Sequence, residues 1–135
     1  MVKNITTVRI RYADTDQMRF VYNGKYLEFF EVGRTELIRE LGMSYKQFEE
    51  FGFLLPVYDA YIRYHSPAFY DEVLEIESIL NTKPMAKLKI EYNIRVGERL
   101  IASGYTQHAF VSTKTGRPVR SPELFNKLFD EHFKE

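Results

Sequence analysis

Polar and apolar residues alternate through much of the second half of the chain, a pattern typical of half-buried β-strands. The alternation is clearest over residues 87–96, where apolar residues take turns with charged or polar ones. Gly97-Glu98 follows directly and has the length of a two-residue hairpin turn. The pattern predicts an antiparallel sheet with one buried and one exposed face. We expect its other strands over residues 57–65, 73–80 and 99–112.

A first strand is predicted near the N-terminus, over residues 6–12. Val8, Ile10 and Tyr12 fall on one face of this segment, and arginines lie between them. The next residues, 13–22, have no clear period. We therefore interpret them as a loop.

The spacing of apolar residues changes after this loop. They recur at intervals of three and four residues, which predicts one long amphipathic helix. Asn23 is the predicted N-cap of this helix, and Gly42 is its predicted end. Gly33 lies mid-helix, where glycine costs about 1 kcal/mol relative to alanine, so we expect the helix to pack closely on the sheet there. The predicted apolar face also comprises Tyr26, Leu27, Phe29, Phe30, Leu37, Ile38 and Leu41.

Two shorter helices complete the prediction. One covers residues 44–51 and ends at Gly52. The other is capped by Ser121 and has Pro122 at its first position. A strand, a long helix, four strands and a short helix indicate an α+β fold, and the length fits a single domain over residues 1–135.

Composition narrows the classes of function. Nineteen lysines and arginines balance 19 aspartates and glutamates, which argues against non-specific binding to nucleic acid or a membrane surface. The absence of cysteine excludes disulfides and thiol catalysis, and the three histidines lack the spacing of metal ligands. No apolar run approaches the roughly 20 residues that span a bilayer. We expect a cytoplasmic protein with no membrane span, no metal and no nucleic-acid partner.

Six short segments of the chain form a recognisable series. They are residues 12–16 (YADTD), 21–23 (VYN), 26–31 (YLEFFE), 34–36 (RTE), 64–72 (YHSPAFYDE) and 116–118 (GRP). In this order, they resemble the 4-hydroxybenzoyl-CoA thioesterase family and its bacterial acyl-CoA thioesterase relatives. The resemblance implies a hotdog fold, in which an antiparallel sheet wraps around a long central helix. It also implies hydrolysis of acyl-CoA thioesters without a cofactor.

The same resemblance implies positions for the catalytic groups. The family's catalytic aspartate falls on Asp16, and the backbone N–H that polarises the thioester carbonyl falls on Asn23. Thioester hydrolysis needs an activated water or a nucleophile, and donors where negative charge develops on oxygen. Asp16 meets the first need as base or nucleophile, and the amides of Asn23 and Gly24 at a helix start meet the second. No serine–histidine pair is evident from position in the sequence.

Further residues are assigned to substrate binding. Tyr22 and Tyr26 are predicted to line the acyl site, with core packing as the other interpretation of Tyr22. Arg117 and Arg120, in one loop with Lys114, are predicted to meet the phosphates of CoA. Solvated loop charges are the other interpretation of these three residues.

Some positions depart from the family pattern or remain open. Many relatives have a glycine where Arg19 stands, so Arg19 is expected to narrow the site or to bring a positive charge near the ligand. Some have a histidine where Asn23 stands. Asparagine, unlike histidine, cannot act as a titrating partner. Asp14 is expected to stabilise the loop. Because another branch of hotdog thioesterases uses a helix carboxylate, Glu28 and Glu31 are the second-choice bases.

Three alternatives to an acyl-CoA thioesterase remain. They are a thioesterase for acyl carrier protein, a hotdog dehydratase and a non-catalytic acyl-CoA-binding protein. A dehydratase is disfavoured because residues 23–41 contain no histidine. Edge strands in a small domain are often paired across a dimer, so we expect a homodimer or homotetramer.

Overall fold

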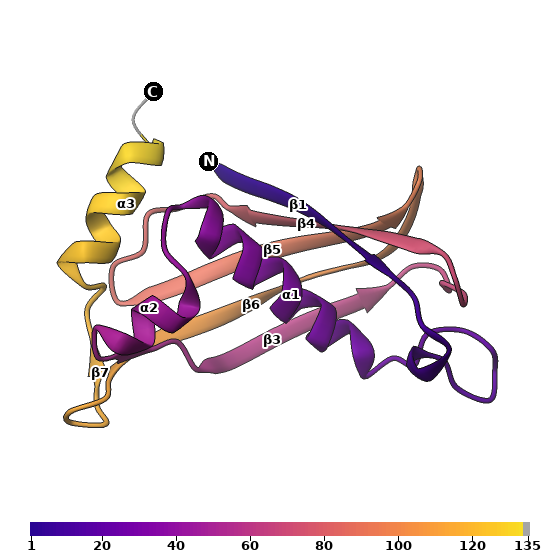
Figure 1. The fold of residues 1–135 in the computed structure, drawn as a ribbon, viewed down its shortest axis with the longest axis horizontal. Coiled ribbons are helices and arrows are strands. Elements are labelled where there is room, and N and C mark those ends of the chain that lie inside the picture. The colour runs from indigo at the N-terminus through magenta and orange to yellow at the C-terminus, as the bar shows by residue number, and fades with distance from the viewer. Residues whose placement is uncertain (134–135) are drawn as a thin grey trace.

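A computed structural model describes residues 1–133 of the chain (Figure 1). Its elements, in chain order, are β1 (Val2–Arg9), the 3₁₀ turn η1 (Tyr12–Asp14), α1 (Lys25–Glu40), α2 (Tyr45–Glu50), β2 (Phe53–Leu54), β3 (Val57–Tyr64), β4 (Val73–Leu80), β5 (Lys87–Val96), β6 (Arg99–Ser112), β7 (Pro118–Val119) and α3 (Glu123–Phe133).

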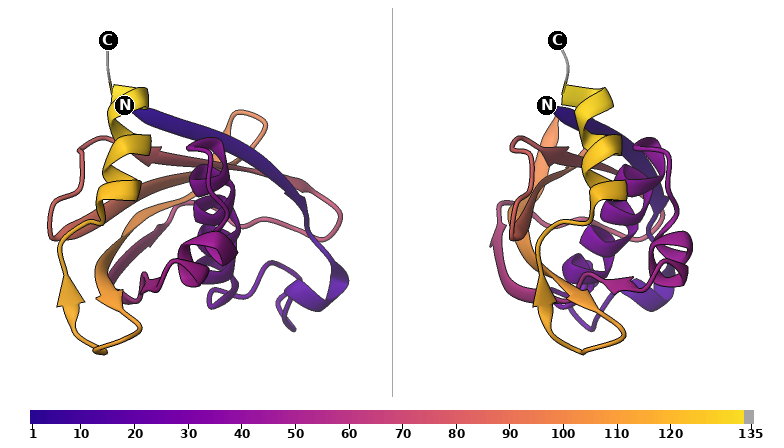
Figure 2. Two further views of the ribbon diagram at one scale, coloured as in Figure 1. Left: turned by 60° about the vertical axis from the view of Figure 1, so that its left-hand side comes forward. Right: turned by 90° about the vertical axis from the view of Figure 1, so that its left-hand side faces the viewer.

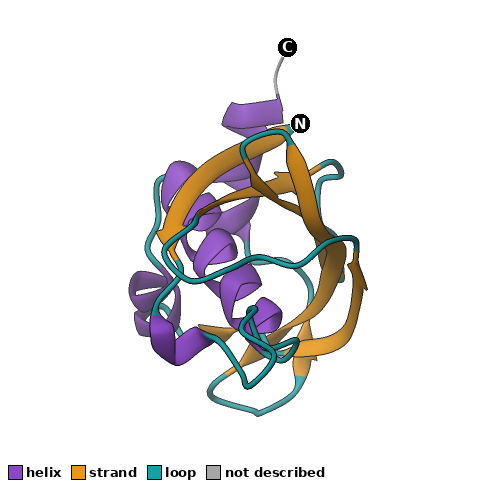
Figure 3. Ribbon diagram, turned by 90° about the vertical axis from the view of Figure 1, so that its right-hand side faces the viewer, coloured by secondary structure: helices purple, strands orange, loops and turns teal. Residues whose placement is uncertain are grey.

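The strands form one antiparallel sheet that curves around α1, as Figure 3 shows. Its main order is β1-β4-β5-β6, and β3 pairs with the other edge of β6. The short strands β2 and β7 pair with the last residues of β6. The sheet wrapped around a long helix confirms the predicted α+β architecture.

The predicted alternation in β5 is confirmed. Leu88, Ile90, Tyr92 and Ile94 are each at most 1% exposed, and the residues between them face outward or are half-buried. The β5–β6 hairpin turns at Gly97, as predicted, and this glycine has a positive φ of 58°. One face of the sheet therefore belongs to the core and the other to solvent.

Close packing of α1 on the sheet explains the glycine in its middle. A Cβ added to Gly33 would lie 2.4 Å from Ser78 Oγ and 2.6 Å from Ile76 Cγ2. One turn earlier, the rings of Phe30 and Tyr92 stack with their centres 4.2 Å apart. The predicted reason for Gly33 is confirmed, because any side chain there would push α1 off β4.

The helix start differs from the prediction. The N-cap of α1 is Gly24, whose backbone is already helical, and no side chain caps the helix. Asn23 is therefore not the N-cap. A tight turn precedes the helix, in which Lys25 N–H donates to Tyr22 C=O at 2.9 Å. Asn23 lies inside this turn, and the cap position therefore falls on Gly24. The predicted end is confirmed, since Gly42 has a φ of 107°.

Two other predictions at element ends are wrong. The first strand covers residues 2–9 and not 6–12, and Tyr12 is 78% exposed in η1. The strand ends because Asp14 accepts a hydrogen bond from the Arg11 amide and turns the chain. Ser121 does not cap α3, because its Oγ is buried without a hydrogen-bond partner in the described part of the chain.

One long edge of the sheet is open. Among the described residues β3 pairs only with β6. Leu27 of α1 is 46% exposed, so its predicted place in the buried face is wrong. It lies in a shallow hollow between α1 and β3 that Val57 also lines. The large apolar side chains exposed along β3 are Val57, Tyr58, Tyr61 and Tyr64.

One end of the sheet is covered by an aromatic cluster. Phe125 of α3 lies 5.4 Å from Phe48 of α2 and 5.5 Å from Phe110 of β6, measured between ring centres. Phe129 packs on Phe125 at 4.6 Å. In Figure 2, α3 stands near the N-terminus at this end of the sheet. Among the described residues, no helix has the length and apolar character needed to cross a membrane.

Candidate active site

The loop between β1 and α1 folds back on itself as a small hairpin. Tyr22 N–H donates to Asp14 C=O at 3.0 Å, and Asp16 N–H donates to Phe20 C=O at 3.2 Å. These bonds bring the backbone of Asp16 beside the segment that leads into α1. Asp16, which the sequence predicts to lie in a loop, is therefore held beside the start of the helix.

The tip of this hairpin explains the unusual residue at position 19. Arg19 N–H donates to Asp16 C=O at 2.9 Å, and Arg19 has a φ of 72°. A turn followed by a left-handed residue is a common three-residue hairpin loop, and its left-handed position favours glycine. The glycine of many relatives is thereby explained by the backbone. The Arg19 side chain is exposed.

Asp16 itself has little to hold its carboxylate. The residue is half-buried, and its Oδ1 accepts one hydrogen bond, from Met18 N–H at 2.8 Å. No cation among residues 1–133 lies within ion-pair distance of it. Its second oxygen is therefore free to contact water or a substrate.

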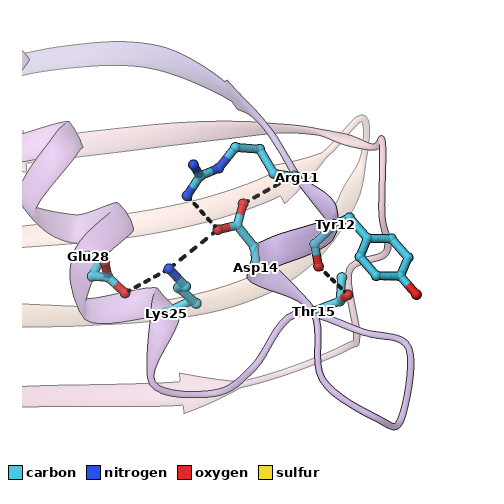
Figure 4. A network of polar contacts seen from close by, with 6 residues as sticks. All are labelled: Arg11, Tyr12, Asp14, Thr15, Lys25 and Glu28. Carbon is cyan, nitrogen blue, oxygen red and sulfur yellow. Dashed lines mark hydrogen bonds and ion pairs between the residues drawn. The ribbon is translucent and has the colours of Figure 1, made fainter.

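Asp14, two positions earlier, is fully engaged (Figure 4). It is 2% exposed and accepts hydrogen bonds from Arg11 N–H at 2.9 Å and from the Arg11 guanidinium at 3.2 Å. Lys25 Nζ of α1 lies 3.5 Å from the same carboxylate and 3.3 Å from Glu28. Burial acts to raise the pKa of Asp14, but the Arg11 hydrogen bonds and the charges of Arg11 and Lys25 outweigh it, so the pKa lies below its usual value. Asp14 fastens the loop to the helix.

Two backbone amides at the start of α1 point away from the helix. The carbonyls of Tyr22 and Asn23 accept turn hydrogen bonds from Lys25 N–H at 2.9 Å and from Tyr26 N–H at 3.4 Å. Every peptide bond is trans, so the N–H groups of Asn23 and Gly24 point in the opposite direction. Within residues 1–133 neither amide donates to another protein group. The positive end of the helix dipole lies behind them.

A cavity of about 400 Å³ opens beside this helix start. Its size is within the usual range for small-molecule sites. Tyr26 forms part of its buried wall, where burial, with the charges of Tyr64 and Glu72, raises the pKa of Tyr26 to about 12. The lining residues are Phe20, Val21, Asn23, Tyr26, Tyr64, His65, Ser66 and Pro67.

Tyr22 lies outside this lining. It is 54% exposed, and a Cβ at Gly24 would lie 2.6 Å from Tyr22 Cε2. The Tyr22 ring therefore covers Gly24 on one side, and a side chain at position 24 would displace that ring. Neither core packing nor a cavity wall describes this tyrosine.

The contact between His65 and Ser103 was not predictable from their positions in the sequence. His65 Nε2 lies 2.8 Å from Ser103 Oγ, although 38 positions separate them. Among the described residues no group orients the other ring nitrogen of His65. A nucleophilic serine normally requires such a third group, so this pair does not replace Asp16 as the candidate.

The connection between β6 and α3, which carries the basic residues, lies at the other end of the molecule from the loop between β1 and α1 (Figure 1). Arg120 and Lys87 line a second hollow, of about 500 Å³, and Lys87 Nζ lies 5.3 Å from the centre of the Tyr58 ring. Arg117 is exposed in the loop and does not line this hollow. Within one chain, the structure does not bring Arg117 or Arg120 together with Asp16.

The second-choice carboxylates lie along α1, away from the cavity. Glu28 is exposed and paired with Lys25. Glu31 and Arg34 line the hollow of about 240 Å³ between α1 and β3. Among residues 1–133, no group of three or more histidine, aspartate or glutamate side chains is placed to hold a metal ion.

Comparison with known proteins fits this geometry. The thioesterase-like superfamily matches residues 10–129. The chain belongs to this superfamily. It is 35% identical over 120 residues to the putative acyl-CoA thioesterase YneP of Bacillus subtilis, across 87% of this chain and 86% of that protein. It is also 29% identical over 123 residues to the acyl-CoA thioesterase YbgC of Haemophilus influenzae, across 90% of each protein.

Solved structures agree with the sequence comparisons. The crystal structure of a DHNA-CoA thioesterase from Staphylococcus aureus is similar to this thioesterase-like chain with a TM-score of 0.90 and 28% identity, across 98% of this chain and 91% of that one. The predicted hotdog fold and the resemblance to the 4-hydroxybenzoyl-CoA thioesterases and their relatives are confirmed. The thioesterase-like protein is an enzyme of the thioester hydrolase class.

Proposed function

We propose that the protein hydrolyses acyl-CoA thioesters at the cavity beside the start of α1. One observation carries the proposal. An unpaired carboxylate, Asp16, lies on a rigid hairpin that leads directly to two free backbone amides, those of Asn23 and Gly24. The relatives named acyl-CoA thioesterases support CoA as the carrier of the acyl group.

In this proposal the acyl group enters the cavity and its carbonyl oxygen meets the two amides. Asp16 removes a proton from water as the water oxygen attacks the carbonyl carbon, or attacks the carbon itself. The N–H groups stabilise the oxyanion that forms. In the first route the C–S bond then breaks, and the CoA thiolate takes the proton from Asp16, which leaves a free acid and a thiol. In the second route the C–S bond breaks to leave an acyl–Asp16 anhydride and the CoA thiolate, and water then hydrolyses the anhydride to the free acid and supplies the proton for the thiol. The apolar, ring-lined walls around Tyr26 suit an acyl group.

The CoA end of the substrate is assigned to the basic hollow. Arg120 and Lys87 provide positive charge for phosphates, the Tyr58 ring provides a flat surface for the adenine base, and Arg117 lies exposed in the neighbouring loop. This hollow is lined by Tyr58, near the start of β3, and the cavity by Tyr64, at its end. One extended substrate therefore reaches both only if a second copy contributes one of them.

Pairing of two open β3 edges supplies such an arrangement. In an antiparallel pair related by a two-fold axis, the Tyr58 end of one β3 lies beside the Tyr64 end of the other. The basic hollow of one copy then faces the cavity of its partner. We therefore propose a homodimer, alone or within a homotetramer, as the active form. Unpaired strand edges are a common route to such dimers.

The test replaces Asp16 with asparagine. Asn keeps an oxygen for the Met18 amide but cannot act as base or nucleophile, so we expect kcat to fall about 100-fold or more with little change in stability. Free thiol release is measured with short, long and aromatic acyl-CoAs, and with one acyl group on acyl carrier protein. Asp130→Asn, on the exposed face of α3, is the matched control. Full activity of Asp16→Asn, with loss in Glu28→Gln or Glu31→Gln, would move the base to α1.

A further inference from the structure

The last residue of β3 holds the peptide that carries one of the two amides. Tyr64 Oη–H donates to Asn23 C=O at 3.0 Å, a contact between residues 41 positions apart. The Tyr64 ring lines the cavity, is 51% exposed, and meets the ring of Tyr26 edge-on with 5.5 Å between centres. The hydroxyl thus reaches from the cavity wall to the helix start.

This bond acts on both ends of one peptide group. Asn23 C=O and Gly24 N–H belong to the same planar trans unit and point in opposite directions. The other donor to Asn23 C=O is Tyr26 N–H, at a long 3.4 Å. Gly24 has no side chain that would restrict rotation of this peptide. The Tyr64 hydroxyl is therefore its strongest fixed contact, and donation to the carbonyl also makes the N–H a better donor.

We propose that Tyr64 is a positioning residue, whose hydroxyl aims and strengthens the Gly24 N–H toward the developing oxyanion. The inference rests on the proposed function, because it assumes that this amide binds the thioester oxygen. It assigns Tyr64 a role through the Asn23–Gly24 peptide, without direct contact to the reacting atoms. The acyl group touches the Tyr64 ring, and the hydroxyl acts behind the reaction.

A role of this kind affects the transition state more than the bound substrate. The charge on oxygen is largest in the transition state, so a misdirected donor lowers kcat and leaves KM nearly unchanged. Loss of a whole oxyanion donor costs about 100-fold or more. A donor that is weakened but present costs less, and we expect a decrease in kcat of about tenfold.

Tyr64→Phe is the test, because it removes the hydroxyl and keeps the ring in the cavity wall. Tyr61→Phe is the matched control. Tyr61 lies in the same strand, its ring stacks on Tyr105 5.7 Å away, and its hydroxyl has no hydrogen bond to the described residues. Steady-state kcat and KM are measured with one acyl-CoA, together with Tm. The infrared C=O stretch of the same ¹³C-labelled acyl-CoA is recorded on Asp16→Asn and on Asp16→Asn/Tyr64→Phe.

The inference predicts a tenfold lower kcat for Tyr64→Phe, KM within about twofold, and unchanged kinetics for Tyr61→Phe. It also predicts that the carbonyl stretch, lowered on Asp16→Asn, returns toward its solution value in the double variant. A change in KM or Tm alone would reduce Tyr64 to a wall of the cavity and overturn the inference. So would wild-type kcat, while the proposed function would stand on Asp16→Asn. An unshifted carbonyl on Asp16→Asn itself would instead refute the oxyanion role of the amides.

Discussion

On the inner side of the loop between β1 and α1, Asp14 is 2% exposed and bound by Arg11 and Lys25. On the outer side, Asp16 is half-buried and holds only the Met18 amide. One residue separates these carboxylates in the sequence. The carboxylate of Asp14 makes three contacts that fix the loop, and the carboxylate of Asp16 makes one. Placement of the loop and chemical availability are thus divided between these two residues.

The strongest test of this division replaces the inner carboxylate. In Asp14→Asn, half-buried Lys25 loses one of its two ion-pair partners and the Arg11 guanidinium loses a charged acceptor, so we expect the free energy of unfolding to fall by about 2 kcal/mol. Urea unfolding of both Asp→Asn variants measures the effect. Asp16→Asn should unfold within about 0.5 kcal/mol of the wild type. Equal losses for the two variants would contradict the division.

Acidification tests the contribution of the same carboxylate by protonating it. Burial opposes ionisation of Asp14, but its Arg11 and Lys25 contacts hold its folded pKa below the usual value of 3.8. Its contribution to stability is therefore complete above the unfolded pKa of about 4 and is lost as the pH falls through the lower folded pKa. We expect wild type to lose stability more steeply than Asp14→Asn below about pH 4. Unfolding in urea at pH 5, 4 and 3 measures this, and parallel curves would exclude the effect.

The smallest expected effect concerns Arg19, at the tip of the hairpin that carries Asp16. Arg19→Gly and Arg19→Ala both remove the positive charge, but only glycine adopts the φ of 72° without strain. We expect the glycine variant to be more stable than the alanine variant by about 1 kcal/mol. Thermal unfolding of both is compared with their kcat and KM. Equal stability would rule out a backbone role, and a shared rise in KM would restore a charge role for Arg19.

Strands were predictable because their signal is local. A buried strand face repeats every second residue, and β5 carries that repeat without interruption. The strands β2 and β7, which form the pairs Phe53–Ser112 and Val111–Pro118 with β6, could not be predicted in this way. Strands β2 and β7 have two residues each, too few to show a period, and they exist only because the end of β6 lies beside them.

Helix caps were less predictable than helix faces. Asn23 and Ser121 have side chains that favour caps, which is a statistical preference of single residues. The actual start of α1 depends on the turn from Tyr22 to Lys25, and Ser121 Oγ is buried instead. The first outcome is set by a local turn that the residue type of Asn23 does not reveal, and the second by the burial of Ser121 in the folded chain.

The candidate site was predictable in part. The resemblance pointed to Asp16 and Asn23, and the predicted helix start pointed to the Gly24 amide, because all three positions belong to one continuous segment. The hydroxyl of Tyr64 and the hollow around Arg120 could not be located in the same way. They approach their neighbours through the pairing of β3 and β5 with β6, and a sequence shows such pairing only after the fold is known.

The pairing of β1 with β4 has a consequence for how the chain is made. Val2 lies opposite Leu80 and Arg9 opposite Val73, so a large part of the chain must be closed into a loop before this ladder forms. During synthesis, β1 has no strand to pair with until β4 has emerged from the ribosome. The aromatic cluster forms later still, because Phe125 belongs to α3. Assembly of the core is therefore largely postponed until α3 has been translated, and the nascent chain carries an unpaired strand edge until β4 has emerged.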